Sequence, residues 1–452
     1  MLKVVKFGGS SLSEEKQFKK VYDIIKSDSE RRIVVVSALG KRDSHDSKIT
    51  DLLYILHAHI KFSVPYDDIW NMIEKRFIDV KESLKLDFDI KSELDHIHSE
   101  LKKGISEDYL VSRGEYLTAK LMASYLGYTF KDAKDLIKFD YEAKIDYDKT
   151  EPLVKEAFIT SEKIVVPGFY GSYPNGDIKL LSRGGSDVTG SILAKSIHAD
   201  LYENWTDVSG ILVADPRIVE NPMAIKEITY HELRELSYMG ANVLHEETIF
   251  PIQSLNIPIN IKNTNRPMDS GTLILDECSD NTQPITGIAG KKNFISFSIF
   301  KNHMSNEIGY VRKVLSLFER YNVSIEHIPT GIDTVSIVCS ADSVEKYKYE
   351  IVQELKSSLG ADNVSVMEEL SLIAVVGRNM KGYIGLSGKL FSVLGEEKIN
   401  VRMIAQGPEE INIILGIDTK DYDRTIRLIY DNLIRLKSVD VASELLTLDK
   451  DE

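Results

Sequence analysis

The 452-residue sequence has only two cysteines and no long apolar run, and both absences exclude whole classes of protein. Cys278 and Cys339 lie far apart without a Cys-x-x-Cys pair or a Cys/His cluster, so we expect neither a disulfide framework nor a zinc site. No segment approaches the roughly 18 apolar residues of a membrane span. Lys3 and Lys6 interrupt the apolar stretch that a signal peptide would need. We therefore expect a cytoplasmic protein that does not bind membranes.

The sequence also lacks the charge pattern of a nucleic-acid-binding surface. Acidic residues outnumber basic ones by 70 to 56, the net charge is −14, and no block rich in lysine or arginine stands out. A local basic pocket for a small anion remains compatible with this balance. Because domains average about 150 residues, the length predicts roughly three units.

The N-terminus contains the most informative stretch. The apolar run of residues 2–7 stops at Gly8, Gly9 and Ser10, a pattern typical of a strand that turns into a helix. Glycines let the backbone approach a ligand, free N–H groups at a helix start favour phosphate, and Lys6 adds a mobile charge. The stretch matches neither the Walker A nor the Gly-x-Gly-x-x-Gly pattern. On these residues alone, an ordinary turn explains it equally well.

Similar turns recur further along the chain. Residues 33–36 read as a buried strand that leads into Ser37–Gly40, and residues 179–181 lead into Arg183–Asp187 ahead of a helix. In open parallel sheets such loops gather at the carboxyl ends of the strands, where ligands bind. Because strand-like and helix-like segments alternate, we predict a mostly parallel, nucleotide-binding α/β sheet, with residues 51–110 as a helical excursion beside it.

After about residue 285 the sequence changes style and then repeats itself. Alternating apolar and polar residues predict an antiparallel strand with one face in water. Ile308-Gly309 and Ile384-Gly385 are 76 residues apart, and the same offset aligns further apolar and glycine positions. We interpret this as two copies of a small α+β unit, which tend to bind a ligand between copies.

Together these motifs resemble the aspartate kinases of the amino acid kinase family, followed by two ACT domains. The resemblance covers essentially the whole chain and implies a three-layer α/β sandwich with a mostly parallel central sheet, plus two ferredoxin-like (α+β) ACT domains. The implied bounds are 1–284 for the catalytic domain, 285–370 for the first ACT region and 371–452 for the second, and the copies can be intertwined. The motifs that carry it are Lys6–Ser11, Arg183–Asp187, Thr206-Asp207, Asp215-Pro216-Arg217 and Gly240–His245.

The resemblance implies transfer of the γ-phosphoryl group of ATP to the side-chain carboxylate of L-aspartate. The product would be 4-phospho-L-aspartate, and the reaction the first step of lysine, threonine and methionine synthesis. The acceptor carboxyl, with an ordinary pKa near 3.9, is ionised at neutral pH and needs no general base. The obstacle is repulsion between two anions, so catalysis must come from positioning and positive charge. Mg²⁺ is expected mainly on the nucleotide phosphates, with no metal site made by side chains alone.

The resemblance also assigns site residues position by position. The catalytic residues are Lys6 and Asp187. The substrate-binding positions, with Arg183 on the α-carboxylate and Glu115 near the α-amino group, are Ser37, Thr50, Glu115, Arg183 and Ser186. The nucleotide-binding positions are Lys6, Gly8, Gly9, Ser10, Thr206, Asp207, Arg217 and Asn242. Plain helix capping by Ser186 or Asp187 and a first-turn dipole role for Glu115 are the alternatives.

The sequence departs from the family pattern at three positions. Asn242 stands where many members have a lysine that contacts the nucleotide, and Leu212 stands where a tyrosine is common. Glu246 occupies a position where a proline often follows the histidine. These departures put nucleotide affinity in question more than the reaction.

The ACT pair resembles the feedback sensor of monofunctional aspartate kinases. We favour lysine over threonine as the effector, because the acidic Glu326 suits a cationic ligand. A structural dimerisation module is the alternative, and the resemblance implies a homo-oligomer, dimer or tetramer, assembled through the ACT domains. The positions that match the effector site are Met304, Gly309, Tyr310, Val311, Asn322, Ser324, Glu326, Asn379 and Met380.

Two rival functions stay open at this point. One is another amino acid kinase that acts on glutamate or a related acid. The other is a non-catalytic regulator that keeps the fold and binds an amino acid. The presence of Lys6, Arg183 and Asp187 argues against the second rival.

Overall fold

The computed structural model describes residues 1–101, 104–182, 184–241, 244, 246–279 and 283–435. The chain divides into two compact units. The first contains residues 1–211, 224–230 and 242–279, and the second contains residues 212–223, 231–241 and 280–452. Two segments within the predicted catalytic range, 212–223 and 231–241, therefore group with the second unit.

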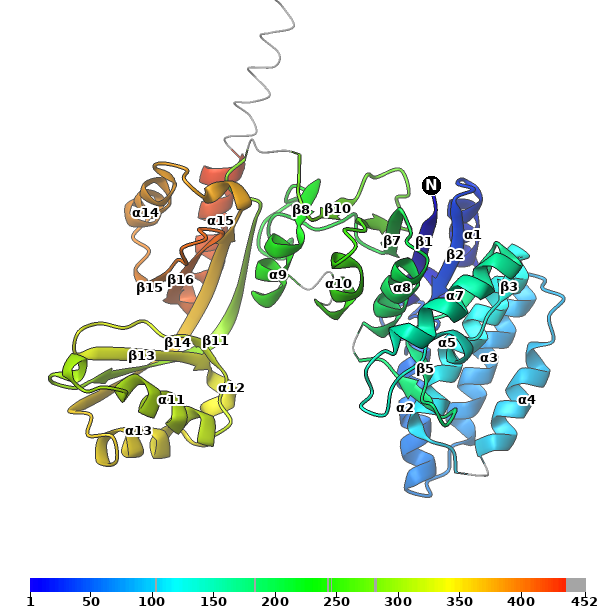
Figure 1. Cartoon of the computed structure of the whole chain (residues 1–452), viewed down its shortest axis with the longest axis horizontal. Helices are drawn as coiled ribbons and strands as arrows, with labels where there is room; N and C mark the ends of the chain where they lie inside the picture. Colours follow the sequence, from blue (N-terminus) through cyan, green and yellow to red (C-terminus); the bar gives the residue numbers. More distant parts are fainter. Residues whose placement is uncertain (102–103, 183, 242–243, 245, 280–282, 436–452) are drawn as a thin grey trace, which may run out of the picture. The chain divides into compact units, whose positions relative to one another are not determined.

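An eight-stranded sheet forms the centre of the first unit, with the strand order β3-β4-β2-β1-β7-β9-β10-β8 (Figure 1). Every neighbouring pair is parallel except β9 and β10, which confirms the predicted mostly parallel sheet. The strands are β1 (Lys3–Phe7), β2 (Arg31–Val36), β3 (Thr129–Phe130), β4 (Ile164–Pro167), β7 (Leu201–Thr206), β8 (Glu227–Thr229), β9 (Ile259–Asn263) and β10 (Thr272–Leu275). A short hairpin of β5 (Tyr170–Ser172) and β6 (Ile178–Leu180) follows β4.

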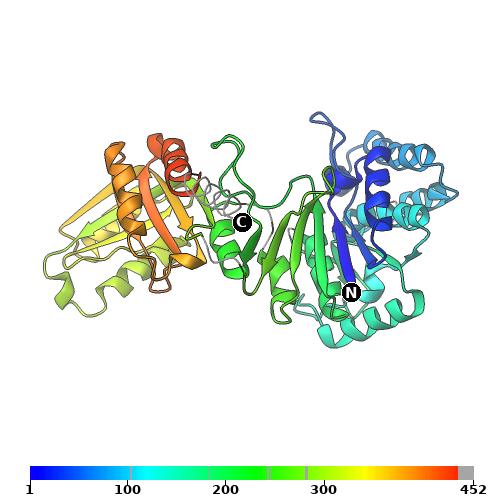
Figure 2. The same ribbon diagram turned by 90° about the horizontal axis from the view of Figure 1, so that it is seen from above.

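Helices cover the sheet on both sides and complete three layers (Figure 2). The helix α5 (Glu107–Leu126) packs on β2 and β4 together with α1 (Glu15–Lys26), and α8 (Gly185–Ser196) packs on β1 and β7. Apolar side chains of alternate strand positions, such as Val5 and Phe7, are buried against the α1 and α5 layer. The remaining helices of these layers are α6 (Ala133–Leu136), α7 (Tyr147–Ser161) and α10 (Glu246–Gln253).

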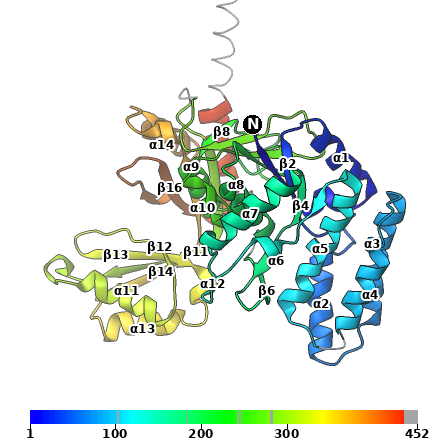
Figure 3. The same cartoon turned by 45° about the vertical axis from the view of Figure 1, so that its right-hand side comes forward.

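The segment predicted as a helical excursion contains α2 (Ile49–Lys61), α3 (Asp67–Ser83) and α4 (Ile90–Leu101). These helices run alongside α5 and alongside one another (Figure 3). Their apolar stripes, including Leu56 and Phe77, join the same buried cluster as β1 and β2. The excursion is therefore part of the core of the first unit. No helix among the described residues is long and apolar enough to cross a membrane.

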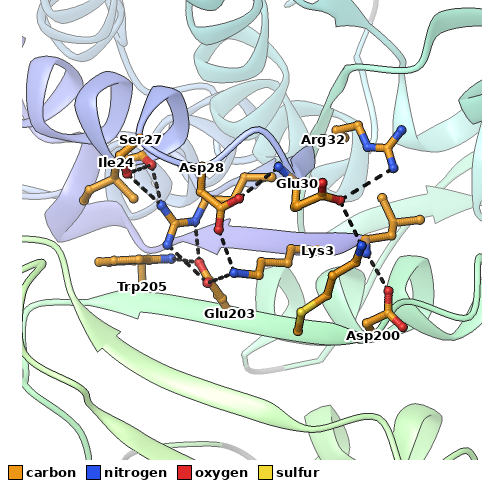
Figure 4. A network of polar contacts seen from close by, with 12 residues as sticks. Lys3, Ile24, Ser27, Asp28, Glu30, Arg32, Asp200, Glu203 and Trp205 are labelled. Atoms are coloured by element: carbon orange, nitrogen blue, oxygen red, sulfur yellow. Dashed lines mark hydrogen bonds and ion pairs between the residues drawn. The ribbon is translucent and has the colours of Figure 1, made fainter.

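A buried charge network ties β1, β2 and β7 together at the side chain of Glu203 (Figure 4). Arg31 donates from Nε and Nη2 to the two carboxylate oxygens of Glu203 at 2.8 and 3.2 Å. Trp205 Nε1 donates to Glu203 at 2.8 Å, and Lys3 Nζ lies 3.7 Å from the same carboxylate. Lys3 also donates to Asp28 at 2.6 Å. Because a buried charge is tolerated when it is fully paired, this network fixes the three strands side by side.

The second unit contains an antiparallel six-stranded sheet with the order β12-β13-β11-β14-β16-β15. Its two central strands are long: residues 294–300 of β11 pair with the first part of β14, and residues 287–291 pair with its last part. Bulges between these stretches divide the sheet into two four-stranded halves. The strands are β11 (Gly287–Phe300), β12 (Ile325–His327), β13 (Thr334–Ser340), β14 (Asn363–Val376), β15 (Val401–Ala405) and β16 (Asn412–Asp418).

Each half of this sheet has the strand order of a ferredoxin-like fold, as predicted for a pair of ACT domains. The edge strand of the second half is the beginning of β11, which precedes the first half in sequence, so the copies are intertwined. Gly309 and Gly385 both cap a helix at φ +80° and +90°, which explains the repeated glycine. The helices of this unit are α9 (Tyr230–Tyr238), α11 (Tyr310–Arg320), α12 (Ala341–Val344), α13 (Lys348–Ser357), α14 (Leu386–Glu396) and α15 (Tyr422–Ile429).

We predict that Glu203→Gln lowers the free energy of unfolding of the first unit by about 3 kcal/mol, because it leaves the buried Arg31 without a counter-charge. Urea unfolding followed by tryptophan fluorescence measures this, since Trp70 and Trp205 both lie in the first unit. The control is Lys144→Ala, which removes an exposed pair with Glu142 and is expected to change the value by less than about 0.5 kcal/mol. Equal effects of the two variants would contradict the prediction.

Candidate functional site

The carboxyl ends of four central strands lie in register at one edge of the sheet. Phe7 pairs with Val36 on one side and with Trp205 on the other, and Val36 pairs with Pro167 of β4. Beyond the strands, backbone N–H groups continue the ladder from loop to loop: Ser37 donates to Phe7, Gly8 to Trp205 and Gly168 to Val36, at 2.9–3.1 Å. Two of the three loops that the sequence predicts to gather, those after β1 and β2, therefore begin side by side. The third follows β6, which pairs with β5 in a separate antiparallel hairpin and is not a strand of the large sheet.

The glycine turn after β1 is held between two neighbouring loops. It continues from Gly8 into a short 3₁₀ turn, η1 (Gly9–Leu12). Gly40 N donates to Gly9 O at 3.0 Å, and a Cβ on Gly40 would lie only 2.3 Å from that oxygen. On the other side, the hydroxyls of Ser11 and Thr264 share a hydrogen bond of 2.7 Å. The turn is therefore fixed by close backbone contact, which explains the glycine at position 40.

Lys6 and Asp187 form an ion pair beside this turn. Lys6 is paired in register with Asn204 of β7, so both side chains point to the α8 side of the sheet. Asn204 Nδ2 donates to Asp187 Oδ1 at 2.9 Å, and Lys6 Nζ lies 3.5 Å from Asn204 Oδ1. A Cβ on Gly8 would lie 3.6 Å from Lys6 Nζ. The two predicted catalytic residues are thus together, and the ammonium lies next to the glycine turn.

Asn204 is a member of this cluster that sequence reasoning missed. It is 4% exposed and lies in the middle of β7, between Glu203 and Trp205. A polar amide in a strand that is buried on both faces needs a hydrogen-bond partner, so an asparagine within this strand was the sequence signal for a polar cluster. Its partners are the ammonium of Lys6 and the carboxylate of Asp187.

Glu115 lies on α5 behind the loop that follows β2. Its side chain is fully buried, one carboxylate oxygen has no hydrogen-bond partner among the described residues, and the backbone N–H of Ala38 donates to the carboxylate. Burial raises the pKa of Glu115 to about 8, although hydrogen bonds from backbone N–H groups, including that of Ala38, and the nearby charge of Arg113 act in the opposite direction. The arrangement offers a buried acceptor to a cationic donor.

The alternative role for Glu115 as a first-turn dipole residue is wrong. The helix begins at Glu107, one residue after the capping Ser106, so Glu115 lies in its third turn. Plain capping by Ser186 or Asp187 is wrong as well. The residue that precedes α8 is Gly184, at φ +75°, no side-chain cap is formed there, and the Asp187 carboxylate faces Lys6.

The loop after β4 presses against the first turn of α8. A Cβ on Gly168 would lie 2.6 Å from the Ser186 hydroxyl oxygen, so these two residues are in close contact. Phe169 adopts φ +78°, a region unusual for a non-glycine residue, and its N–H donates to the Thr189 hydroxyl at 3.0 Å. Backbone strain of this kind is stored where the surroundings enforce it, often at functional sites.

Of the remaining predicted substrate positions, one lies on the loop after β2 and one on α2. Ser37 is half-buried directly after β2, and its N–H donates to Phe7. Thr50 is half-buried in the first turn of α2, which begins where Ile49 N donates to Leu39 O at 3.1 Å. Arg183 lies outside the described residues.

Of the predicted nucleotide positions, Thr206 and Asp207 lie at the same sheet edge. The Thr206 hydroxyl donates to the Asp207 carboxylate at 3.1 Å, and Asn263 Nδ2 donates to the Asp207 carbonyl at 3.2 Å. Arg217 belongs to the second unit, where its exposed guanidinium pairs with Asp215 at 2.6 Å. Asn242 lies outside the described residues.

Most of the predicted effector positions surround α11 and β12 in the first ACT copy. Gly309 begins the helix, Tyr310 is 1% exposed with Lys301 Nζ 4.6 Å from its ring centre, and Asn322 adopts φ +56°. The Glu326 carboxylate accepts a hydrogen bond of 2.5 Å from the Tyr238 hydroxyl of α9. Met304 is buried, Val311 is half-buried and Ser324 is exposed.

The other two effector positions lie in the second ACT copy. Asn379 and Met380 belong to the 3₁₀ turn η3 (Arg378–Met380), where Asn379 Nδ2 donates to Gln283 O at 2.9 Å and Met380 is buried. The helix α9 contacts this copy too: its Glu232 pairs with Arg378 at 3.0 Å. Contacts from α9 therefore reach both ACT copies.

Comparison with known proteins identifies the family. The model of the amino acid kinase family matches residues 1–263, and an ACT domain model matches residues 373–433. Aspartokinase 3 of Bacillus subtilis is 35% identical over 444 residues, which cover 95% of this chain and 98% of the relative. A crystal structure of Clostridium acetobutylicum aspartate kinase, described as an allosteric enzyme, is 47% identical with a TM-score of 0.90 and covers 96% of this chain and 99% of that one.

Two crystal structures of E. coli aspartokinase III are also similar. One is a complex with aspartate and ADP (26% identity, TM-score 0.72), and the other a complex with lysine and aspartate (25%, 0.73). The matches cover 96% of this chain in both cases, and 100% and 99% of the respective relatives. By its sequence and its fold, the chain belongs to the aspartokinases, which are enzymes of the amino acid kinase family with C-terminal ACT domains.

Proposed function

We propose that the chain transfers the γ-phosphoryl group of ATP to the side-chain carboxylate of L-aspartate, which yields ADP and 4-phospho-L-aspartate. The observation that carries the proposal is the buried ammonium of Lys6, paired with Asp187 beside the glycine turn. The likeness to an aspartokinase crystallised with aspartate and ADP supports the same substrates. Relative rates with aspartate and glutamate distinguish this proposal from a glutamate kinase.

The chemistry of this reaction fits the residues at the sheet edge. The acceptor is already an anion at neutral pH, so the site needs no general base and instead has to offset repulsion between carboxylate and phosphates. Lys6 supplies a full positive charge, and the N–H dipoles at the glycine turn add partial charges. Asp187 and Asn204 hold the ammonium in one place, so the charge is preorganised before the reaction begins.

Mg²⁺ would accompany the nucleotide. Among the described residues, no group of three or more His, Cys, Asp or Glu side chains gathers closely enough to hold a metal ion. Mg²⁺ is usually held by one or two carboxylates together with substrate phosphates, and Asp187 is a carboxylate that lies beside the ammonium of Lys6. When bound, the ion would neutralise phosphate charge.

The proposed aspartate site lies between the loop after β2 and the first turn of α8. Glu115 would accept a hydrogen bond from the α-ammonium, because its buried carboxylate has an oxygen without a partner among the described residues. Ser37, Thr50 and Ser186 would contact the rest of the amino acid, and Arg183 remains the predicted partner of the α-carboxylate. On the nucleotide side, the proposed contacts are Gly8, Gly9, Ser10, Thr206, Asp207, Arg217 and Asn242.

For the second unit we propose feedback inhibition by lysine, in a homo-oligomer assembled through the ACT domains. The support is the Glu326 carboxylate on β12, together with the likeness to an aspartokinase crystallised with lysine and aspartate. The Glu326 carboxylate already accepts a hydrogen bond from the hydroxyl of Tyr238, which lies on α9. An effector ammonium would either displace this hydroxyl or share the carboxylate with it. Threonine is the alternative effector.

We predict that Lys6→Ala lowers kcat by about 10³-fold in an assay of ATP-dependent aspartyl hydroxamate formation. A charge about 4 Å from its partner is worth on the order of 4 kcal/mol at an effective dielectric of 20, and this energy corresponds to that factor. Lys120→Ala is the matched control: Lys120 is also a largely buried lysine, paired with Glu93, but it belongs to α5 and lies outside the proposed site. Near-normal turnover of Lys6→Ala would overturn the proposal.

We predict that Glu115→Gln raises the KM for aspartate by about tenfold or more at pH 8 with a smaller change in kcat, because an amide cannot pair with the α-ammonium. Glu107→Gln, on the exposed first turn of the same helix, is the control and should leave KM unchanged. Steady-state kinetics with aspartate varied at saturating ATP measures the effect. A KM equal to that of the wild type would exclude Glu115 from the aspartate site.

The same variant is expected to change how stability depends on pH. The pKa of Glu115 is raised from 4.5 to about 8 in the folded chain, so the stability that the protonated carboxyl contributes is present below pH 4.5 and is lost as the pH rises toward 8. Glu115→Gln should therefore raise the melting temperature relative to the wild type at pH 8 and lose this advantage near pH 5. If the difference in melting temperature between the two proteins were the same at pH 5 and at pH 8, the raised pKa of Glu115 would be refuted.

We predict that lysine inhibits the enzyme and that Glu326→Ala weakens this inhibition by about tenfold or more, since it removes the carboxylate that pairs with the effector's ammonium. Turnover without lysine should be unchanged. Glu319→Ala, an exposed acidic position at the end of α11, serves as the control. Inhibition by threonine and not by lysine would show that the proposed effector is wrong.

A further inference from the structure

A buried arginine from the helical excursion reaches the loops of the candidate site. Arg76 lies on α3 and is 5% exposed. Its Nη2 donates to the carbonyl oxygens of Gly40 at 2.7 Å and Ser13 at 3.4 Å, and its Nη1 donates to the Ser47 carbonyl at 3.2 Å. One guanidinium therefore binds backbone carbonyls of both the loop after β1 and the loop after β2.

Two of these three residues, Gly40 and Ser13, adjoin the glycine turn. Gly40 N already donates to Gly9 O, so the peptide groups that flank Gly40 are held by the turn on one side and by Arg76 on the other. Ser13 follows directly on the 3₁₀ turn that Gly9 begins. Arg76 thus contacts the end of the turn directly and its start through Gly40.

The guanidinium is itself fixed from the loop after β2. Asp46 Oδ2 accepts from Arg76 Nη1 at 2.8 Å, and the same carboxylate accepts from the Arg42 backbone N–H and side chain. Partial burial acts in the opposite direction, but the hydrogen bonds from Arg42 and the charge of Arg76 lower the pKa of Asp46 to about 2. The pair is therefore charged throughout the range in which the enzyme would work.

We propose that Arg76 is a positioning residue for phosphoryl transfer, which holds the glycine turn and the loop after β2 at the spacing that binding of the ATP phosphates and aspartate requires. The inference rests on the proposed function, because it assigns that turn to the phosphates. A planar fork of donors makes these contacts in fixed directions, and the single ammonium of a lysine cannot replace them. Displacement of catalytic groups by about 1 Å can lower the rate by about 100-fold.

The experiment compares Arg76→Lys with Arg31→Lys in the full-length enzyme. Arg31 is the matched control, since it too is a buried arginine that contacts a carboxylate, Glu203, and a backbone carbonyl, that of Ile24. Both variants should lose thermal stability. We expect Arg76→Lys to lower kcat/KM for ATP by about 100-fold and to raise KM for ATP and for aspartate, whereas Arg31→Lys keeps the wild-type constants.

Asp46→Asn provides a second variant of nearly the same shape, which is expected to fold with lower stability because it removes the counter-charge of Arg76. It keeps the three carbonyl contacts of Arg76 and weakens the bonds of residue 46 to Arg76 and Arg42, so we expect a loss of about fivefold in kcat/KM for ATP. If Arg76→Lys fails to fold, this variant decides the question. If the folded variants kept the wild-type kcat and KM values, with or without lower stability, the role of Arg76 would be purely structural. Absence of aspartyl hydroxamate formation by the wild type would instead refute the proposed function.

Discussion

Under the proposed function, the repulsion between two anions is the constraint to which the first unit is adapted. An ammonium that offsets this repulsion has to be partly shielded from water to be effective, and a shielded ammonium needs a counter-charge. Lys6 meets both conditions, because the parallel register of β1 and β7 places it beside Asn204 and the start of α8 supplies Asp187. The order of the strands, the glycine after β1 and the helix start at Gly184 are the means by which this one charge is held.

Much of the site was predictable because its signals are local. An apolar run that ends in Gly8-Gly9 predicts a strand followed by a tight turn, and the parallel sheet then brings the turns together. Glu115 shows where local reading failed. A first-turn role for Glu115 requires a helix that begins shortly before it, although Ser106 followed by Glu107 and Asp108 is a capping signal that lies further upstream. Asn204 was missed because an amide within a strand indicates that a hydrogen-bond partner exists but not which residue it is.

The least predictable contacts are those between side chains and distant backbone. Arg76 binds carbonyl groups, which every residue carries, so no pattern in the sequence marks its partners. The sequence predicted a helical excursion beside the sheet. It did not indicate which basic residue of the excursion points toward the loops of the candidate site. The structure also groups residues 231–241 with the regulatory unit, a fact that depends on packing and not on sequence order.

The shared strands of the second unit make the sensor indivisible. Residues 287–291 close the sheet of the second ACT copy, although they precede the whole of the first copy in the chain. A fragment cut between the copies would leave β14 with an open edge of unpaired N–H and C=O groups, which is a template for aggregation. Neither copy could therefore be lost or exchanged alone in evolution without exposing such an edge, and the pair has to be inherited as one piece.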